Sequence, residues 1–565
     1  MNYLQLTLGS SLFTLCCVVA QAQEFNAPAP IALGYQWEID PDLNASWSLP
    51  FPDLDRSVDL QRLTSPVLEY RLQEARHVME NAEFLDATEQ AEARQALLAA
   101  LRNGASNRMV RLAQASAWCK LYDADSAHEL WDSCQKDSTV RDFVEQVLIT
   151  QRSDLALSTW LSRLVDAQAD PRQQLTAIDG VAACQAKSAI DPLTDLLRNE
   201  QTNFPVKLAA ARALGILADA GLEELASQWL DSNRTLKEQV AANLLANHDT
   251  PGAEAMMDRI VKGSFAPAQV VAYRWFATWR PTVAQEMAAQ MIKHADSSLR
   301  LLAARVLQQV DDADSLRMQA NLLSDRNLTV RRTIRNHLIA KAENADLRPV
   351  VDELVAAHLR GEAFEGIEQA MLVAAGLNDK SHCPQLVALL EHPRPEVHVR
   401  AAWALEQLVD DPELLSQILK HCVQWTDWLA NDNAAHPVED TDLFRMAHLF
   451  GALGRNAYQP ADEMLRLYVP KNTQKMRPTT RIPAIWALGL IWKGNQETGL
   501  ERELIARIMD MSTTDPEEDT VRYACALTLG RLGNKSSIEA LENTHFKAPD
   551  PVGVAIDWAL QQLRN

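Results

Sequence analysis

The apolar positions of residues 521–541 follow a helical period that is interrupted once by a turn. Spacings of three and four residues gather the small and branched side chains of the first half onto one broad face of a helix. Gly533 is expected to end that helix. Ser536, followed three residues later by Glu539, has the pattern of a capping box that starts a second helix. The segment therefore predicts a helical hairpin, and its remaining apolar face requires neighbouring hairpins.

The same pattern recurs along most of the chain. Each unit has an aliphatic residue at its first position, small residues at the fourth and fifth, and an apolar residue at the ninth. Clear units begin at Val206, Leu299, Val397, Val521 and Val552. Weaker units begin at Val110, Val140, Gln173, Leu236, Val270, Val330, Ile367, Arg445 and Thr480. The mean spacing of about 34 residues predicts an all-α fold, an α-solenoid of stacked antiparallel helical hairpins.

The repeat unit resembles a known family. Its V-R-x-A-A-x-x-A-L-G pattern, with an Asp before it, is similar to HEAT repeats, specifically the short kind also found in phycobilisome lyases. The tetratricopeptide repeat has the same length, but its Trp, Gly-Tyr and Pro positions are not met here. The resemblance implies a HEAT-like superhelix, but it indicates almost nothing about function.

The resemblance also implies a ladder of ion pairs. The basic residue after the first Val would pair with an acidic residue of a neighbouring repeat. Basic residues occupy that position at Arg111, Arg141, Lys207, Lys237, Arg300, Arg331 and Arg522, with Asp137, Asp296 and Asp519 just upstream in three units. Exposed pairs contribute only about 0–1 kcal/mol each. The ladder is therefore expected to set the register of the repeats more than their stability.

The N-terminal residues 1–22 have the composition of a secretory signal peptide. They contain no charged side chain, have an apolar run, and end in Ala20-Gln21-Ala22, a small-residue cleavage pattern. Gly9-Ser10-Ser11 dilutes the run, which weakens the alternative of a membrane anchor of about 20 apolar residues. A lipoprotein signal would require a small residue where Leu15 precedes Cys16. We therefore predict an exported protein, periplasmic or extracellular.

The mature chain divides into three further segments. Residues 23–64 are rich in Pro and aromatic residues and are predicted to form an extended arm. The arm either covers the apolar end of the first repeats or tethers a partner. Residues 65–106 are predicted to form N-terminal capping helices at about 66–81 and 88–103, starting with Ser65 as N-cap and Pro66 at the first helical position. Residues 107–565 form the repeat solenoid.

The net charge limits the kinds of partner, and the cysteine spacing limits the possible disulfides and metal sites. The formal net charge of −21 argues against nucleic acid and anionic membrane surfaces as general partners. Six cysteines follow the leader, and none forms a CxxC pair. Cys119 and Cys134 flank a hairpin turn at unequal distances, beyond the expected reach of a disulfide. We predict mostly buried free thiols.

Two irregular intervals point to a candidate binding site. The spacing from Val397 to Arg445 is 48 residues and that from Thr480 to Val521 is 41, and both intervals hold acidic loops. Insertions into repeats map to loops on one face, often the binding face. The predicted partner-binding residues are Trp425, Trp428, Asp432, His436, Asp440 and Asp442. They would contact a protein or a carbohydrate; the alternative is a lengthened helix with two core Trp residues and a solvated loop.

Two basic clusters and one acidic run are further candidates for binding. Each basic cluster could dock an acidic partner segment or be a solvated face. The clusters consist of Arg326, Arg331, Arg332 and Arg335, and of Lys471, Lys475, Arg477 and Arg481. The acidic run Asp515 to Asp519 lacks the spacing of a calcium loop. It is interpreted as an N-terminal flank favoured by a helix dipole.

No sequence motif supports catalysis, a metal or a cofactor. GxSxG, P-loop, GxGxxG and HExxH patterns are absent. His128-Glu129 is the single adjacent His-Glu pair, whereas deoxyhypusine hydroxylase, a HEAT-type iron enzyme, uses several. The predicted function is an exported HEAT-repeat scaffold that mediates protein–protein interaction. The alternative is an α/α-toroid-like carbohydrate-active enzyme or carbohydrate-binding protein, which would need about six or seven hairpins closed into a ring and paired carboxylates.

Overall fold

The computed structural model describes residues 58–102, 107–230, 235–430, 438–471, 476–496, 498–544 and 551–564. All regular secondary structure within these ranges is helical. The chain forms two compact units, which comprise residues 58–287 and 288–564 of the described part. The leader 1–22, and most of the arm predicted for 23–64, lie outside these ranges.

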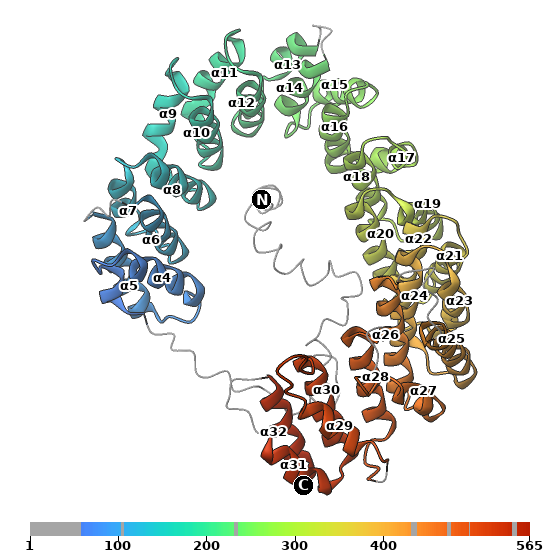
Figure 1. Ribbon diagram of the computed structural model, residues 1–565. Coiled ribbons are helices and arrows are strands. Elements are labelled where there is room, and N and C mark those ends of the chain that lie inside the picture. Colours follow the sequence, from blue (N-terminus) through green and yellow to red (C-terminus); the bar gives the residue numbers. More distant parts are fainter. Residues whose placement is uncertain are drawn as a thin grey trace. The chain divides into compact units, whose positions relative to one another are not determined.

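Helices of the first unit form two layers (Figure 1). One layer contains the even-numbered helices, each of which contacts the next even-numbered one. These helices are α4 (Leu68–Asn81), α6 (Arg108–Lys120), α8 (Ser138–Thr150), α10 (Pro171–Ala183), α12 (Phe204–Leu217), α14 (Thr235–Leu245) and α16 (Ala266–Trp279). The other layer contains α5 (Ala87–Arg102), α7 (Ala127–Cys134), α9 (Leu157–Val165), α11 (Ile190–Arg198), α13 (Glu223–Leu230) and α15 (Pro251–Val261). The short α3 (Leu60–Leu63) precedes both layers, and α17 (Pro281–Met291) contains the boundary between the units.

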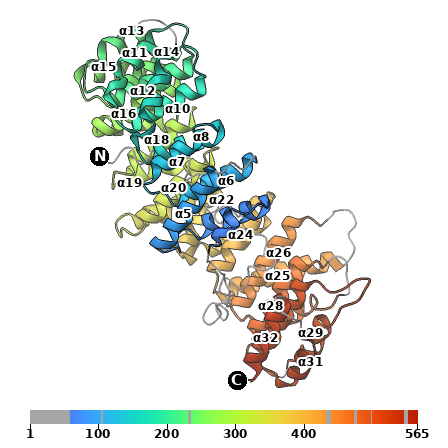
Figure 2. The same ribbon diagram turned by 90° about the vertical axis from the view of Figure 1, so that its left-hand side faces the viewer.

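The second unit repeats this arrangement. Its even-numbered helices are α18 (Ser297–Leu307), α20 (Leu328–Lys341), α22 (Phe364–Gly376), α24 (Pro395–Leu408), α26 (Asp440–Arg455), α28 (Pro478–Ile491), α30 (Asp519–Leu532) and α32 (Pro551–Arg564). Its odd-numbered helices are α19 (Ala313–Ala320), α21 (Arg348–Leu359), α23 (Cys383–Ala388), α25 (Pro412–Ala430), α27 (Asp462–Arg466), α29 (Glu501–Ile508) and α31 (Ile538–Asn543). The turned view shows α29 and α31 lying to one side of α28 and α32 (Figure 2). Each unit is thus an α-solenoid of stacked helical hairpins, as the repeat predicted.

Short 3₁₀ turns lead into or out of several odd-numbered helices. They are η1 (Asp154–Ala156), η2 (Lys187–Ala189), η3 (Asn321–Ser324), η4 (Lys380–His382), η5 (Leu389–Glu391), η6 (Gln459–Ala461) and η7 (Lys535–Ser537). Five of them, η1, η2, η4, η6 and η7, precede an odd-numbered helix, and η3 and η5 follow one.

Small residues allow the even-numbered helices to approach closely. A Cβ atom on Gly454 of α26 would lie 2.6 Å from the Cα of Ala487 in α28, closer than carbon atoms can approach without displacement. A Cβ on Gly530 of α30 would lie 2.7 Å from the Trp558 ring of α32. Gly454 and Gly530, each the tenth residue of its repeat, are therefore packing residues.

Side-chain caps begin many of the even-numbered helices. The side chains of Asn107, Asp137, Asp170, Asp296 and Asn327 accept hydrogen bonds from backbone N–H groups of the first turn. The same residue types recur at the repeat boundary because an uncapped first turn leaves several N–H donors unsatisfied.

Three local predictions were wrong. The helix expected to start at Ser65-Pro66 begins at Leu68, and the Ser65 hydroxyl accepts the N–H of Val67 in the preceding turn. Residues 60–63, at the end of the predicted arm, form α3. Ser536 caps no α-helix, because Asn534 accepts its N–H and starts η7. Gly533 does end α30, with φ of 76° in the left-handed region.

The cysteines after the leader are free thiols. Cys134, Cys383, Cys422 and Cys525 are buried, and Cys119 and Cys184 are partly exposed. Burial raises the pKa of the Cys525 thiol to about 12, which disfavours the reactive thiolate. The prediction of mostly buried thiols is confirmed. No helix within the described ranges is long and apolar enough to cross a bilayer.

The predicted ladder of ion pairs is present in part. Arg111 in α6 bonds Asp137 at 2.9 Å, and Arg300 in α18 bonds Asp325 at 2.8 Å through Nη2, in each case a carboxylate at the start of the following repeat. Arg522 instead pairs with Asp519 of its own helix. Lys207 and Lys237 depart from the ladder, and both ammonium groups lie over the ring of Trp229.

Candidate functional site

The two tryptophans of the predicted site belong to an unusually long helix. α25 has 19 residues, and Trp425 is only 8 % exposed, with its ring centroid 6.4 Å from that of Trp428. The neighbouring Thr426 is tied to the hydroxyl of Tyr468 at 2.9 Å inside the unit. Trp425 is therefore a core residue and not an exposed aromatic contact. Trp428 is half-buried.

The carboxylates of the predicted site lie at the start of α26. Asp440 is exposed and accepts a hydrogen bond of 2.8 Å from Arg477, the N-cap residue of α28. Asp442 pairs with Arg445 of its own helix at 3.0 Å. Asp432 and His436 lie outside the described residues. The structure therefore brings Asp440 and Asp442 together at one helix N-terminus and sets Trp425 apart from them in the core.

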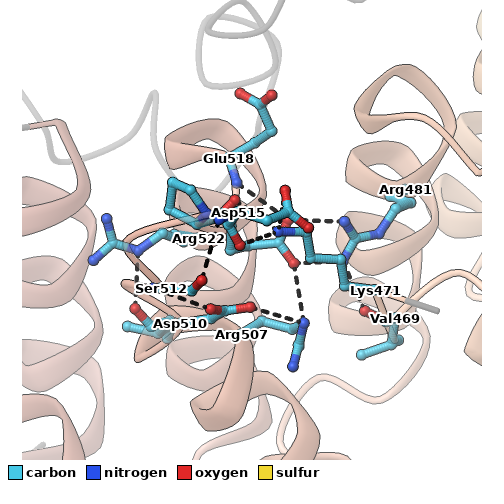
Figure 3. A network of polar contacts seen from close by, with 12 residues as sticks. Val469, Lys471, Arg481, Arg507, Asp510, Ser512, Asp515, Glu518 and Arg522 are labelled. Carbon is cyan, nitrogen blue, oxygen red and sulfur yellow. Dashed lines mark hydrogen bonds and ion pairs between the residues drawn. The ribbon is translucent and has the colours of Figure 1, made fainter. Parts of the chain in front are cut away.

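The second irregular interval is fixed by a buried carboxylate that the sequence analysis missed. The side chain of Glu517 is fully buried and accepts hydrogen bonds of 2.8 and 2.7 Å from Nη1 and Nη2 of Arg481 in α28 (Figure 3). Arg507 of α29 lies 3.5 Å away on its other side. The remaining donors of Arg481 bond the carbonyl oxygens of Tyr468 and Val469. Both buried charges are thus paired and hydrogen-bonded.

The loop around Glu517 is closed by further contacts. The Glu517 N–H donates to the carbonyl of Asp510 at 3.0 Å. The Lys471 ammonium donates to the carbonyls of Asp515 and Pro516 at 2.6 and 2.8 Å and lies 3.0 Å from the Asp515 carboxylate. The loop is therefore held at Asp510 and at residues 515–517, and Figure 3 shows Lys471 against Asp515.

These contacts change the interpretation of the charged clusters. The second basic cluster, which was predicted either to dock an acidic partner segment or to be a solvated face, binds acidic segments of its own chain through Lys471, Arg477 and Arg481. Lys475 lies outside the described residues. The acidic run is more than a helix flank, because Glu517 points into the core. In the other basic cluster, Arg331 donates to the carbonyls of Asp325 and Arg326.

Helix α28 connects the two irregular loops. Its Arg477 reaches the start of α26, and its Arg481, one turn later, reaches the loop before α30. Since α26, α28 and α30 pack side by side, the starts of these three helices form one edge of the second unit. We call it the acidic edge. It consists of the exposed residues Glu439, Asp440, Asp515, Glu518 and Asp519 together with Met509 and Met511.

The side chains of the acidic edge are suited to binding. Its carboxylates accept hydrogen bonds and attract cations, and Met509 and Met511 are 52 % and 56 % exposed, so they offer adaptable apolar contact. Throughout the described part of the chain, no group of three or more His, Cys, Asp or Glu residues is arranged to hold a metal ion.

A signal for the Arg481–Glu517 pair did exist in the sequence. Arg481 follows Thr480, the first position of a repeat, and so occupies the ladder position. The rule that its partner lies in the next repeat leads to the acidic run of residues 515–519. The sequence could not show which of these carboxylates turns inward, because that depends on the path of the loop.

Comparisons with known proteins describe the architecture only. No protein-family model matches the chain, and no curated protein matches it. Importin beta crystallised in ammonium sulfate is similar over 90 % of this chain and 73 % of its own, with 14 % identity and a TM-score of 0.45. Kap95p from a complex with RanGDP covers 89 % and 71 %, with 15 % identity and a TM-score of 0.48. Yeast importin-beta (Kap95p) covers 89 % and 72 %, with 14 % identity and a TM-score of 0.43. At these values we draw no functional conclusion from the likeness; the α-solenoid architecture rests on this chain's own helix contacts.

Proposed function

We propose that the protein is an exported HEAT-like scaffold that binds a protein partner through the acidic edge. The observation that carries this proposal is the buried Arg481–Glu517 pair. A buried ion pair contributes little net stability compared with apolar packing, because both charges lose their hydration. What this pair does provide is a single conformation for residues 509–518. A surface fixed before binding loses less conformational entropy when the partner arrives.

The charge of the acidic edge defines the partner. Its exposed carboxylates, on a chain of formal net charge −21, favour a segment with Lys or Arg side chains. Met509 and Met511 add apolar contact for the same segment. The proposal contains no catalytic step. The likeness to phycobilisome-lyase repeats concerns the repeat type, and pigment attachment would be a cytosolic activity, at odds with the leader.

Export is the second part of the proposal, and it is supported by residues 1–22. Their uncharged apolar run and Ala20-Gln21-Ala22 ending have the pattern of a cleaved leader. The partner would then be met in the periplasm or outside the cell.

Site-specific photocrosslinking tests the binding surface. A photoreactive phenylalanine analogue replaces Met511 in the full chain, and the matched control replaces Met109, which is 65 % exposed in α6 of the first unit. In cells that make the protein naturally, position 511 should give a discrete adduct that position 109 does not give. Gln replacement of Glu439 and Glu518, exposed carboxylates that no ion pair among the described residues engages, should weaken the adduct. The same adducts at both positions, or an adduct indifferent to the Gln replacements, would contradict the proposal.

A further inference from the structure

A hollow of about 970 Å³ opens in the first unit between the ends of α11, α12, α13 and α14. Its walls include Arg198, Glu200, Lys207, Trp229, Leu236 and Lys237. The volume is within the range of clefts that hold small ligands or a short peptide segment. Three cationic side chains and one carboxylate therefore line a hollow on a chain that is strongly acidic elsewhere.

Two ammonium groups converge on one aromatic ring in this hollow. The Nζ of Lys207 lies 5.7 Å from the ring centroid of Trp229, and the Nζ of Lys237 lies 5.6 Å from it. Trp229 is half-buried. Burial lowers the pKa of Lys207; nearby Glu200 acts in the opposite direction and Lys237 lowers it further. The two cations thus repel each other across a shared ring.

The repeat pattern explains why neither lysine is in an ion pair with a carboxylate of the described residues. Arg111 and Arg300, at the same repeat position, reach acids 26 and 25 residues further along the chain. At those distances from Lys207 the sequence has Ser232 and Asn233, and from Lys237 it has Lys262 and Gly263. No ion pair joins Lys207 or Lys237 to a carboxylate among the described residues. The ladder is therefore interrupted in two consecutive repeats, and both interruptions face this hollow.

We propose that this hollow binds an acidic peptide segment of a protein partner, with carboxylates on Lys207 and Lys237 and an apolar side chain beside Trp229. An incoming carboxylate between the two ammonium groups replaces their repulsion by two attractions. Leu236, which is 50 % exposed, offers apolar area that a neighbouring Leu or Phe of the segment would cover. This site is in the first unit and does not depend on the acidic edge.

A peptide fits the hollow better than other polyanions. Nucleic acid would have to approach a chain of net charge −21 over a far larger surface. An acidic oligosaccharide could use the ring and the lysines, but it would leave Leu236 and the neighbouring Leu225 uncovered. The combination of cations with aliphatic lining matches a segment that mixes Asp or Glu with Leu or Phe.

The test uses the full chain and a fluorescein-labelled peptide, Ser-Asp-Glu-Leu-Phe-Glu-Asp-Ser, with binding followed by fluorescence anisotropy. The double variant Lys207→Gln, Lys237→Gln removes both ammonium groups. The matched control, Lys136→Gln with Lys293→Gln, removes the same charge from two exposed lysines elsewhere. Far-UV circular dichroism melts verify that both variants are folded.

The peptide should bind the wild-type and control chains alike and bind the double variant about tenfold more weakly, because two partly desolvated charge contacts are lost. The amide peptide Ser-Asn-Gln-Leu-Phe-Gln-Asn-Ser should bind the wild-type chain about as weakly as the acidic peptide binds the double variant. No binding to the wild type, equal binding by the double variant, or equal binding of the amide peptide overturns the proposal. Displacement of the peptide by a galacturonic acid trimer at a lower concentration than the unlabelled peptide requires would also overturn it, in favour of a carbohydrate.

Discussion

Replacing Glu517 by Gln should loosen the acidic edge without changing its surface residues. Gln preserves the shape of the side chain and one acceptor oxygen, but it removes the charge that balances Arg481, so this buried cation keeps only neutral acceptors, which include the carbonyls of Tyr468 and Val469. Breaking one side of a buried ion pair costs about 3–5 kcal/mol. At 1.4 kcal/mol per factor of ten, a loss of about 3 kcal/mol raises the equilibrium constant for loop opening by about 100-fold.

Hydrogen exchange measures that opening directly. The N–H of Glu517, bonded to Asp510, and the N–H of Val521, bonded to Glu518, report on the loop and on the start of α30. Their exchange should accelerate strongly in Glu517→Gln, while amides of α20 keep the wild-type rate. The double variant Arg481→Met, Glu517→Met removes both charges and should recover much of the protection, since apolar replacement of a buried pair is often neutral. Exchange changed by less than about threefold in Glu517→Gln, or equal losses in the single and double variants, would refute the reasoning.

Three further predictions address other parts of the chain. Burial, and secondarily the nearby Lys341, lowers the pKa of His337 to about 4, so the folded state binds fewer protons than the unfolded state below about pH 6.5. Denaturant titrations should therefore show stability falling by up to about 3 kcal/mol between pH 6.5 and 4, and His337→Phe should flatten this dependence; an unchanged pH profile in the variant would contradict the assignment. Trp425→Ala should lower the thermal midpoint and reduce the free energy of unfolding by about 3–5 kcal/mol, because core volume is lost. Trp428→Ala should reduce it less, because that ring is half-buried. Equal midpoints for the two variants would contradict this difference in burial. A fusion of residues 1–30 to alkaline phosphatase should be active in the periplasm with Gln23 as its new N-terminus, whereas a fusion that lacks residues 1–22 should not be exported; cytoplasmic retention of the first fusion would remove the case for export.

The repeat pattern predicted the architecture because its information is local. The apolar stripe of each even-numbered helix and the small residues that let those helices approach are encoded within one unit, as the packing of Gly530 against α32 shows. Local caps were predicted less well. Ser536 has the right spacing for a capping box, but Asn534 lies nearer to the end of α30 and takes the capping role first.

The candidate site could be predicted only in part, because its contacts join different repeats. The burial of Trp425 depends on the length of α25 and on packing near Tyr468, far along the chain. Arg481 and Glu517 are 36 residues apart, and the inward turn of Glu517 follows from the loop path. The repeat position of Lys207 and Lys237 predicted that they belong to the ladder. Because no acid follows either lysine by 25 or 26 residues in the sequence, their ammonium groups lie over Trp229 instead.

The most direct test of the central claim is the yield of the photocrosslinked adduct at position 511 in chains with and without Glu517. In the proposed function, partner binding needs residues 509–518 in the one conformation that Glu517 imposes through Arg481. The adduct should therefore fall by the fraction of chains in which the loop is open in Glu517→Gln, and return in the Arg481→Met, Glu517→Met double variant. An adduct of wild-type yield in Glu517→Gln, with the loop shown to be open by hydrogen exchange, would contradict it.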